Sequence, residues 1–204
     1  MKKQFACLAG IGLIAVFSGG CTAFNASVKP VEVDKAQPME AKYDYSDLKW
    51  LGSASGQDIV SSSFLKGLPF KPTFVIMGIQ NRTTRHVDTK AITDTMRGGV
   101  LDAGKANFVN ESRRDDLLRE QGYQLANCTP ETRMAIGKQL GANYMISGSL
   151  VEIIKKAPKE VRLSRKEEVF YQMTLEITDL TTGLITWQKQ YERARLESKP
   201  IIGW

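Results

Sequence analysis

The stretch YQMTLEIT, residues 171–178, decides the fold class. Its apolar side chains occupy the odd positions and its polar side chains the even positions, which is the pattern of a strand with one buried face. Residues 181–183, TTG, then supply a turn, and a second alternating run follows with Ile185, Trp187 and Tyr191 as its apolar members. The two runs predict a C-terminal antiparallel hairpin with one face in the core and one polar face.

Two apolar runs upstream predict further strands. FVIMGI, residues 74–79, contains no polar side chain, which is typical of a strand covered on both faces. Residues 144–154 form a second run, and Gly148 within it indicates a bulge or a close approach of another segment. We also expect a short strand at residues 106–109.

Helix signals separate these strands. Asp88 or Thr89 can cap a helix that Gly104 ends, and Thr129 before Pro130 has the order of an N-cap and a first helical residue. The first of these helices should have one apolar face, made of Ile92, Met96, Gly99, Val100 and Ala103. We expect helices over residues 58–65, 89–103, 111–121 and 130–140. The fold class is therefore α/β (or α+β): a small mixed β-sheet with helices packed on one face and a C-terminal antiparallel hairpin.

The N-terminal residues have the layout of a secretory signal. Lys2 and Lys3 precede the uncharged apolar run 5–17, and the small residues 18–20 lead directly to Cys21. A run of about 13 residues is too short to span a bilayer, which needs about 20. Small residues before a Cys resemble a bacterial lipobox, which implies lipidation of Cys21. Plain cleavage that leaves Cys21 unmodified is the alternative.

These features divide the chain into three parts. Residues 1–20 are expected to be a lipoprotein signal peptide, residues 21–42 a lipidated Cys with a disordered tether, and residues 43–204 a globular domain. A tether of this length reaches at most about 70–85 Å when fully extended. By analogy with lipoprotein sorting, Thr22 and Ala23 after the Cys favour the outer membrane.

The composition argues against enzyme chemistry. One His and three scattered Cys among 204 residues leave almost no material for a zinc site or a disulfide framework. The sequence contains no phosphate-binding glycine loop, and His86 has no partners in catalytic spacing. Without residues 1–20, which contain two Lys and no acidic residue, the net charge falls from +6 to a mild +4. We therefore expect no catalytic residues, no metal, no cofactor, no small-molecule substrate and no nucleic-acid partner. Cys128 is expected to be a buried small side chain rather than a reactive thiol.

Four motifs, in order, resemble one family. They are GIQNRTT at residues 78–84, the helical segment 86–105, LGANYMISG at residues 140–148 and LTTGLITW at residues 180–187. Together they are similar to the LpoB-type outer-membrane lipoproteins, the activators of penicillin-binding proteins. The resemblance covers about residues 43–195. It implies a non-catalytic lipoprotein that faces the periplasm from the outer membrane. Its implied partner is the periplasmic domain of a bifunctional penicillin-binding protein, whose peptidoglycan synthesis it would stimulate.

Five residues are candidates for contact with that partner. Asn81, Arg82 and Thr84 follow a buried strand, and loops in such places often carry binding residues. Arg113 and Arg114 lie in a charged helix. The structural alternatives are that Asn81 and Thr83 close a turn and that the charged helix is merely solvated. The basic segment 155–166 is expected to be a solvated hairpin loop, or else an electrostatic contact with an acidic partner or anionic headgroups.

Two other functions remain open from the sequence. The outline GAxYxxxGS … DxxTGxxxW is shared with curli-channel lipoproteins, which implies a role in envelope assembly or secretion. A barrel would need additional amphipathic strands of about 10 residues. The only candidate, residues 155–166, is dense in charge and contains Pro158, which argues against a pore. A flagellar-associated or other structural surface lipoprotein is the remaining alternative.

Overall fold

The computed structural model describes residues 40–156 and 164–200. The predictions for the signal peptide, for Cys21, for most of the tether and for the centre of the basic segment lie outside the described residues. The elements follow in the order α1 (Tyr45–Ser61), α2 (Ser63–Lys66), β1 (Thr73–Arg82), α3 (Thr89–Asp102), β2 (Asn107–Phe108), α4 (Glu111–Glu120), the 3-10 turn η1 (Leu125–Asn127), α5 (Pro130–Gln139), β3 (Tyr144–Lys156), β4 (Ser164–Asp179) and β5 (Ile185–Pro200).

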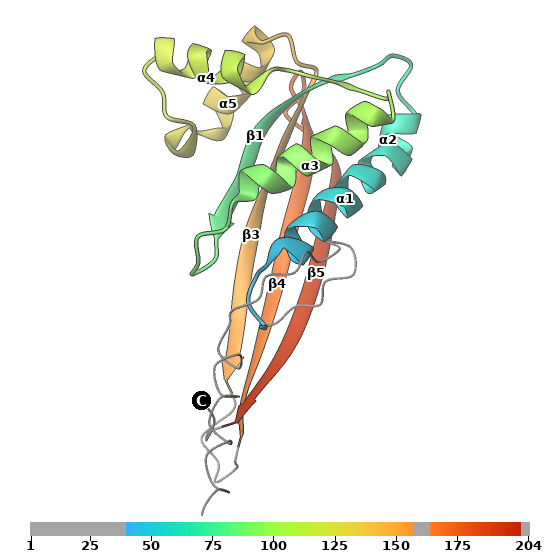
Figure 1. Ribbon diagram of the computed structural model, residues 1–204. Helices are drawn as coiled ribbons and strands as arrows, with labels where there is room; N and C mark the ends of the chain where they lie inside the picture. The colour runs from blue at the N-terminus through green and yellow to red at the C-terminus, as the bar shows by residue number, and fades with distance from the viewer. Residues whose placement is uncertain (1–39, 157–163, 201–204) are drawn as a thin grey trace, which may run out of the picture. The chain divides into compact units, whose positions relative to one another are not determined.

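The strands form one mixed sheet in the order β2-β1-β3-β4-β5. β1 runs parallel to both β2 and β3, whereas β3, β4 and β5 form an antiparallel meander. Figure 1 shows that β3, β4 and β5 continue well past the end of β1. The mixed sheet and the C-terminal antiparallel hairpin confirm the predicted fold class.

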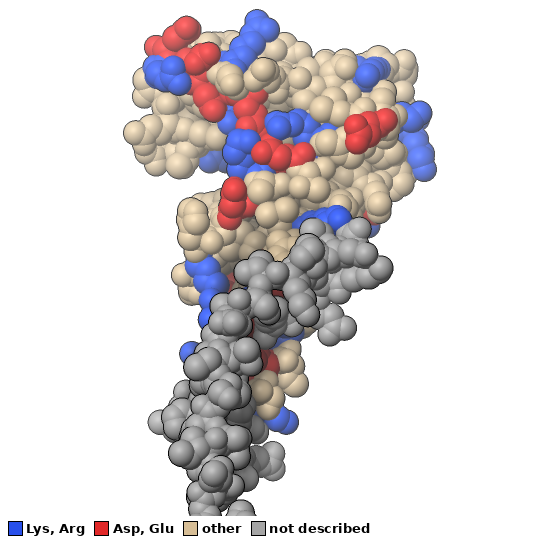
Figure 2. All heavy atoms as spheres, viewed as in Figure 1, with Lys and Arg blue, Asp and Glu red and all other residues tan. Residues whose placement is uncertain are grey.

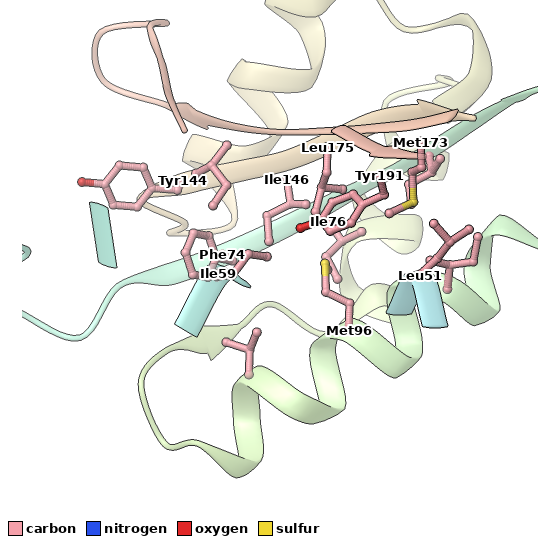
Figure 3. Packing of buried hydrophobic residues seen from close by; sticks show 14 of the residues in the cluster. Leu51, Ile59, Phe74, Ile76, Met96, Tyr144, Ile146, Met173, Leu175 and Tyr191 are labelled. Carbon is pink, nitrogen blue, oxygen red and sulfur yellow. The ribbon is translucent and has the colours of Figure 1, made fainter. Parts of the chain in front are cut away.

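The larger hydrophobic core lies between the sheet and helices α1 and α3. Figure 3 shows Ile76, Ile146 and Leu175 of the strands on the side of the sheet that faces Met96 of α3. Each of these four side chains is at most 4% exposed. Burying a side chain of this size stabilises a fold by about 1.5–3 kcal/mol, so this cluster holds the helices on the sheet.

Helices α1 and α3 approach each other closely because α1 carries glycine at the contact. A Cβ atom on Gly52 would lie 2.5 Å from Cβ of Thr95, and one on Gly56 would lie 3.0 Å from the carbonyl oxygen of Met96. No side chain fits at either position without a shift. The segment GSASGQ therefore packs α1 through its backbone.

This packing explains why no sequence pattern marks the start of α1. The sequence pattern predicts a helix that starts at Asp58, but α1 begins at Tyr45. Its N-cap is Asp44, which forms a capping box with Asp47. Small and weakly polar residues at its contact face give no apolar stripe of helical period, so the pattern that predicts helices is absent there.

The sheet carries helices on both faces, so the expectation of helices on one face is wrong. Val75 and Met77 of β1 and Met145 of β3 pack in a second cluster with Leu118 of α4 and Ile136 of α5. The prediction of a strand covered on both faces at residues 74–79 already required this second layer.

The predicted helix ends are largely confirmed. Asp88 accepts hydrogen bonds from the amides of Lys90 and Ala91 at the start of α3, and Gly104 after that helix has φ +67°. Thr129 caps α5, with Pro130 as its first residue. The buried stripe of α3 differs from the prediction. Gly99 and Ala103 are exposed at the rim, and Thr93 is buried in their place.

Gly148 marks a close approach, as predicted, because a Cβ atom there would lie 2.3 Å from the carbonyl oxygen of Thr174. The hairpin prediction fails near its turn. The register shifts between Ile177 and Thr178, which reverses the alternation beyond that point. Ile185 is consequently 54% exposed instead of lying in the core. Thr178 keeps its side of the sheet and pairs with Met145 of the second cluster, so it is buried under the layer of α4 and α5 instead of lying on a polar face.

Candidate docking surface

The loop after β1 is closed by the side chain of Asn81. Its Nδ2 donates to the carbonyl oxygen of Arg85 at 2.8 Å, and its Oδ1 accepts from the amide and the hydroxyl of Thr83 at 3.0 Å and 2.8 Å. These bonds match the structural alternative for Asn81 and Thr83. They define a rigid turn that fixes the direction in which the neighbouring side chains leave the strand.

Glu152 of β3 anchors the same loop, and the sequence did not single it out. Its Oε2 accepts from the amide and hydroxyl of Thr84 at 3.2 Å and 2.5 Å. Its Oε1 accepts from Nε of Arg85 at 3.1 Å and from the hydroxyl of Tyr171 at 2.8 Å. The Glu152 side chain is completely covered. Thr84 lies at the surface, but its hydroxyl proton is already donated within the molecule.

The four donors keep Glu152 ionised. Burial by itself raises the pKa of this carboxyl, but the hydrogen bonds from Thr84, Tyr171 and Arg85 outweigh burial and lower the pKa of Glu152 below its ordinary value. Burial and the bond to Glu152 in turn raise the pKa of Tyr171 to about 12. The pair therefore remains a carboxylate and a neutral phenol throughout the physiological range.

Arg82 leaves the strand on the face opposite to Asn81. The pairing registers place Arg82, Val151, Gln172 and Glu192 side by side across four strands. Arg82 is exposed, and no hydrogen bond or ion pair within the described ranges engages it. Of the five predicted contact residues, Arg82 most clearly points away from the fold.

The face that carries Arg82 is open. It is formed by Gln80 and Arg82 of β1, the odd-numbered residues 147–155 of β3, and the even-numbered residues 168–176 of β4 and 188–196 of β5. None of these residues is buried, because α4 and α5 cover only the opposite end of this face, near Met145. We call this surface the open face.

Arg114 has an internal role, which corrects its place among the predicted contact residues. It is only 8% exposed, and its guanidinium donates to the carbonyl oxygen of Ile76 and to Oδ1 of Asp115 at 2.8 Å. The amide of Val109 pairs with the carbonyl oxygen of Phe74 on this edge of β1 at 2.8 Å. Because β2 ends there, Arg114 supplies the donor for the next carbonyl group along the edge.

Arg113 is exposed on α4 and is not brought together with Arg82. Its neighbour Arg114 reaches Ile76, and six residues of strand, about 20 Å, separate Ile76 from Arg82. The sequence therefore predicted two exposed cations correctly but not their separation.

The surface over α3 and the start of α4 carries charges of both signs (Figure 2). Arg97 of α3 bonds to Asp94 at 2.6 Å and to Glu111 of α4 at 2.7 Å, and Lys90 bonds to the same two carboxylates at 2.7 Å and 3.1 Å. Figure 2 shows acidic and basic side chains interspersed over α3 and α4. This network joins α4 to α3 and leaves no patch of a single sign there.

A second network holds the N-terminal segment on β5. Arg195 donates to the carbonyl oxygen of Lys42 at 2.7 Å, to Oδ2 of Asp44 at 3.0 Å and to Oδ1 of Asp47 at 2.8 Å. Burial raises the pKa of Asp47 despite Arg195 and Arg193 nearby. Ala41, which we expected in the tether, is buried against Val169 and Tyr171, so ordered packing begins before the expected boundary.

Among the described residues, no group of three or more His, Cys, Asp and Glu side chains is placed to bind a metal ion. No helix in the described ranges is long and apolar enough to cross a membrane. What the described side chains offer is a rigid surface with exposed cations and an uncovered sheet.

Comparison with known proteins identifies the family. The family model described as peptidoglycan-synthase activator LpoB matches residues 50–192. The chain belongs to the LpoB family. No curated protein sequence matches it. Among solved structures, the LpoB C-terminal domain from Escherichia coli superposes with a TM-score of 0.55 at 15% identity, over 72% of this chain and 98% of that domain. The LpoB C-terminal domain from Salmonella enterica gives 0.54 at 15% identity, with the same coverage of both chains.

These findings confirm the resemblance seen in the sequence. The superpositions support the fold. The family match makes this chain a peptidoglycan-synthase activator, a class of regulators rather than enzymes, in agreement with the sequence-based expectation. Members of the LpoB family are lipoproteins of the cell envelope. In this chain the match includes β1, the loop with Asn81 and Arg82, and α4 with Arg113.

Proposed function

We propose that this LpoB-family chain binds the periplasmic domain of a bifunctional penicillin-binding protein and stimulates its peptidoglycan synthesis. The observation that carries the proposal is the family match over residues 50–192. A role in secretion or in a structural surface assembly has no comparable support.

We propose further that the chain acts from the outer membrane. The signal-like residues 1–20 and the lipobox-like Cys21 support removal of a signal peptide and lipidation of Cys21. Several acyl chains would hold the protein stably on a membrane, whereas one would bind only marginally. Residues 21–39 then form a tether, and residues 40–204 carry the domain.

Arg82 and Arg113 are the residues that we assign to the synthase contact. Both are exposed, and both lie on elements that border the open face. A standard interface buries about 800 Å² on each partner, which is wide enough to include two groups about 20 Å apart. Asn81 and Thr84 contribute indirectly, by holding the loop that presents Arg82.

Activation follows from differential binding. The chain must bind the active conformation of the synthase more tightly than the inactive one, and the ratio of the two affinities limits the degree of activation. Anchoring raises the local concentration of the domain only where the tether can reach the synthase. No bond is made or broken by this chain.

The test is glycan polymerisation by a purified bifunctional penicillin-binding protein, with and without residues 22–204 of this chain. We expect a saturable increase in rate and a matching binding isotherm. Residues 22–204 with both Arg82→Glu and Arg113→Glu serve as the contact-deficient comparison, with circular dichroism to show that the variant is folded. An unchanged rate together with no detectable binding would remove the proposal.

A further inference from the structure

The part of the sheet that extends past β1 carries an apolar patch on its open face. β1 makes its last pairing at Arg82, with Val151, and only β3, β4 and β5 continue beyond that row (Figure 1). We call this three-stranded extension the blade. The family match ends at residue 192, so the end of β5 in the blade lies outside it.

Four apolar side chains meet on this face of the blade. Ile153, Phe170 and Ala194 occupy one row across the three strands, and Leu196 lies in the next row beside Glu168. Ile153 is 51% exposed and Leu196 is 68% exposed. Single exposed apolar residues are ordinary on a protein surface, whereas these four are adjacent on an uncovered sheet and form one contiguous apolar patch. We call these four residues the blade patch.

The charges beside the blade patch are arranged for self-association. Lys155 of β3 and Glu168 of β4 lie in one row on the same face, and both are exposed. Place a second copy face to face, related by a two-fold axis that runs along the strands between β3 and β4. Lys155 of each copy then lies over Glu168 of the other, and Ile153 lies over Phe170. An interface of this kind must be self-complementary, and this row satisfies that requirement.

We propose that the blade patch is a homodimer contact, with two copies packed face to face through their blades. The size of the patch determines the strength of the dimer. With the axis between β3 and β4, these two strands overlap in the blade, and two strands about 4.8 Å apart over five residue steps of about 3.4 Å give a flat area of about 160 Å² on each copy. Stable complexes bury about 800 Å² on each partner, so the dimer is weak and reversible in solution. Copies confined to one membrane would associate more readily.

The proposal is independent of synthase activation. Its tests change neither Arg82 nor Arg113, and an activator that stays monomeric would overturn the dimer while leaving the proposed function intact. Conversely, a chain that dimerises but does not stimulate a synthase would overturn only the proposed function.

The first measurement is sedimentation equilibrium of residues 22–204, from about 10 to about 500 µM, the range expected for a contact of this size. The average mass should rise with concentration toward that of a dimer. Ile153→Ser should weaken association about tenfold. Leu184→Ser is the matched control, because Leu184 is 66% exposed but lies at the β4–β5 turn, away from the blade. It should leave association unchanged.

The decisive arm uses two charge variants that repel themselves. K155E places two acidic residues in the row, and E168K places two basic residues there. Each variant alone should remain monomeric, whereas an equimolar mixture should associate, because the acidic row of one variant then faces the basic row of the other across the interface. Rescue on mixing cannot arise from a change in folding. A wild-type chain that is monomeric throughout, or a mixture that fails to associate, would overturn the proposal.

A final arm tests whether the chain covers its own patch. If wild type is monomeric and associates only after residues 22–39 or 201–204 are deleted, the patch is occupied by that segment, and the homodimer is wrong.

Discussion

The hydroxyl of Tyr171 donates a 2.8 Å hydrogen bond to Oε1 of Glu152. The same hydroxyl oxygen accepts a 2.9 Å bond from the amide of Tyr43. Glu152 in turn accepts from Thr84 and Arg85. One covered carboxylate therefore joins the start of the folded domain to the loop that presents Arg82. The position of the exposed cation depends on a network that is centred inside the molecule.

Loss of the Glu152 carboxylate should destabilise the domain. Glu152→Ala leaves the donors of Thr84 and Tyr171 without this acceptor, and hydrogen bonds to a charged group each contribute about 1.5–3 kcal/mol. Because Thr84 and Arg85 can turn to water, we expect a net loss of about 2–3 kcal/mol in the free energy of unfolding. Urea denaturation measures it. Glu176 is a half-buried residue of the open face, and Glu176→Ala should change the free energy of unfolding by less than about 0.5 kcal/mol. Equal losses in both variants would contradict this role for Glu152.

The contribution of Glu152 should also depend on pH. Its pKa in the folded state lies below the ordinary value of 4.5, so the folded state binds the proton less tightly than the unfolded state does. The resulting stabilisation is fully present above about pH 4.5 and is lost as the pH falls through the folded-state pKa.

The difference in unfolding free energy between wild type and Glu152→Gln should therefore be constant near neutral pH and shrink below about pH 4.5. Asp47, whose raised pKa acts in the opposite direction, is present in both chains and cancels in the difference. A difference that grows on acidification would show that the assigned direction is wrong.

Neighbouring arginines on α4 should behave differently. Arg114→Ala removes the donor for the carbonyl oxygen of Ile76 and should cost about 1–3 kcal/mol, the penalty for leaving a buried carbonyl group unpaired. Arg113→Ala should change stability by less than about 0.5 kcal/mol but weaken binding to the synthase. Thermal unfolding and binding, measured on both variants, separate the two roles. A destabilised Arg113→Ala protein would count against this assignment.

The contact between α1 and α3 predicts opposite effects for two glycines. Gly52→Ala forces a methyl group to within 2.5 Å of Cβ of Thr95, and overpacking of this kind costs about 1–3 kcal/mol. Gly99→Ala meets nothing within 4 Å, so the higher helix propensity of Ala should stabilise α3 by up to about 1 kcal/mol. Chemical denaturation of the two variants checks the sign of each effect. Stabilisation by Gly52→Ala would mean that the helices lie further apart.

The elements with strong periodicity or caps were predictable. The continuous apolar run in β1 and the alternation in β4 specify strands because each side chain has a defined side. Asp88 and Thr129 specify helix starts because their side chains accept hydrogen bonds from backbone amides of the first turn. The part of α1 that precedes its last turn was not predictable. Gly52 and Gly56 have no side chains and bring the α1 backbone against α3, so this part of the helix has no apolar stripe.

The candidate surface was only partly predictable for a related reason. Exposure of Arg82 and Arg113 follows from their charge, but burial of Arg114 depends on where β2 ends, which no local pattern records. Glu152 did leave a signal. It occupies a core-facing position in the alternation of β3, between Leu150 and Ile154, and a charged residue there requires several donors. Which residues donate those hydrogen bonds depends on contacts between segments far apart in the sequence.

Stimulation of a synthase tests the central claim most directly. Glycan polymerisation by a purified bifunctional penicillin-binding protein is measured while residues 22–204 of this chain are titrated in. The wild-type chain should raise the rate to a plateau. Arg82→Glu should shift the midpoint to higher concentration by about tenfold or more, the effect of losing about 1.4 kcal/mol of binding. Lys138→Glu, an exposed basic residue on α5, is the charge-matched control and should leave the curve unchanged. A flat response to the wild-type chain at every concentration, with no complex detected, would contradict the account.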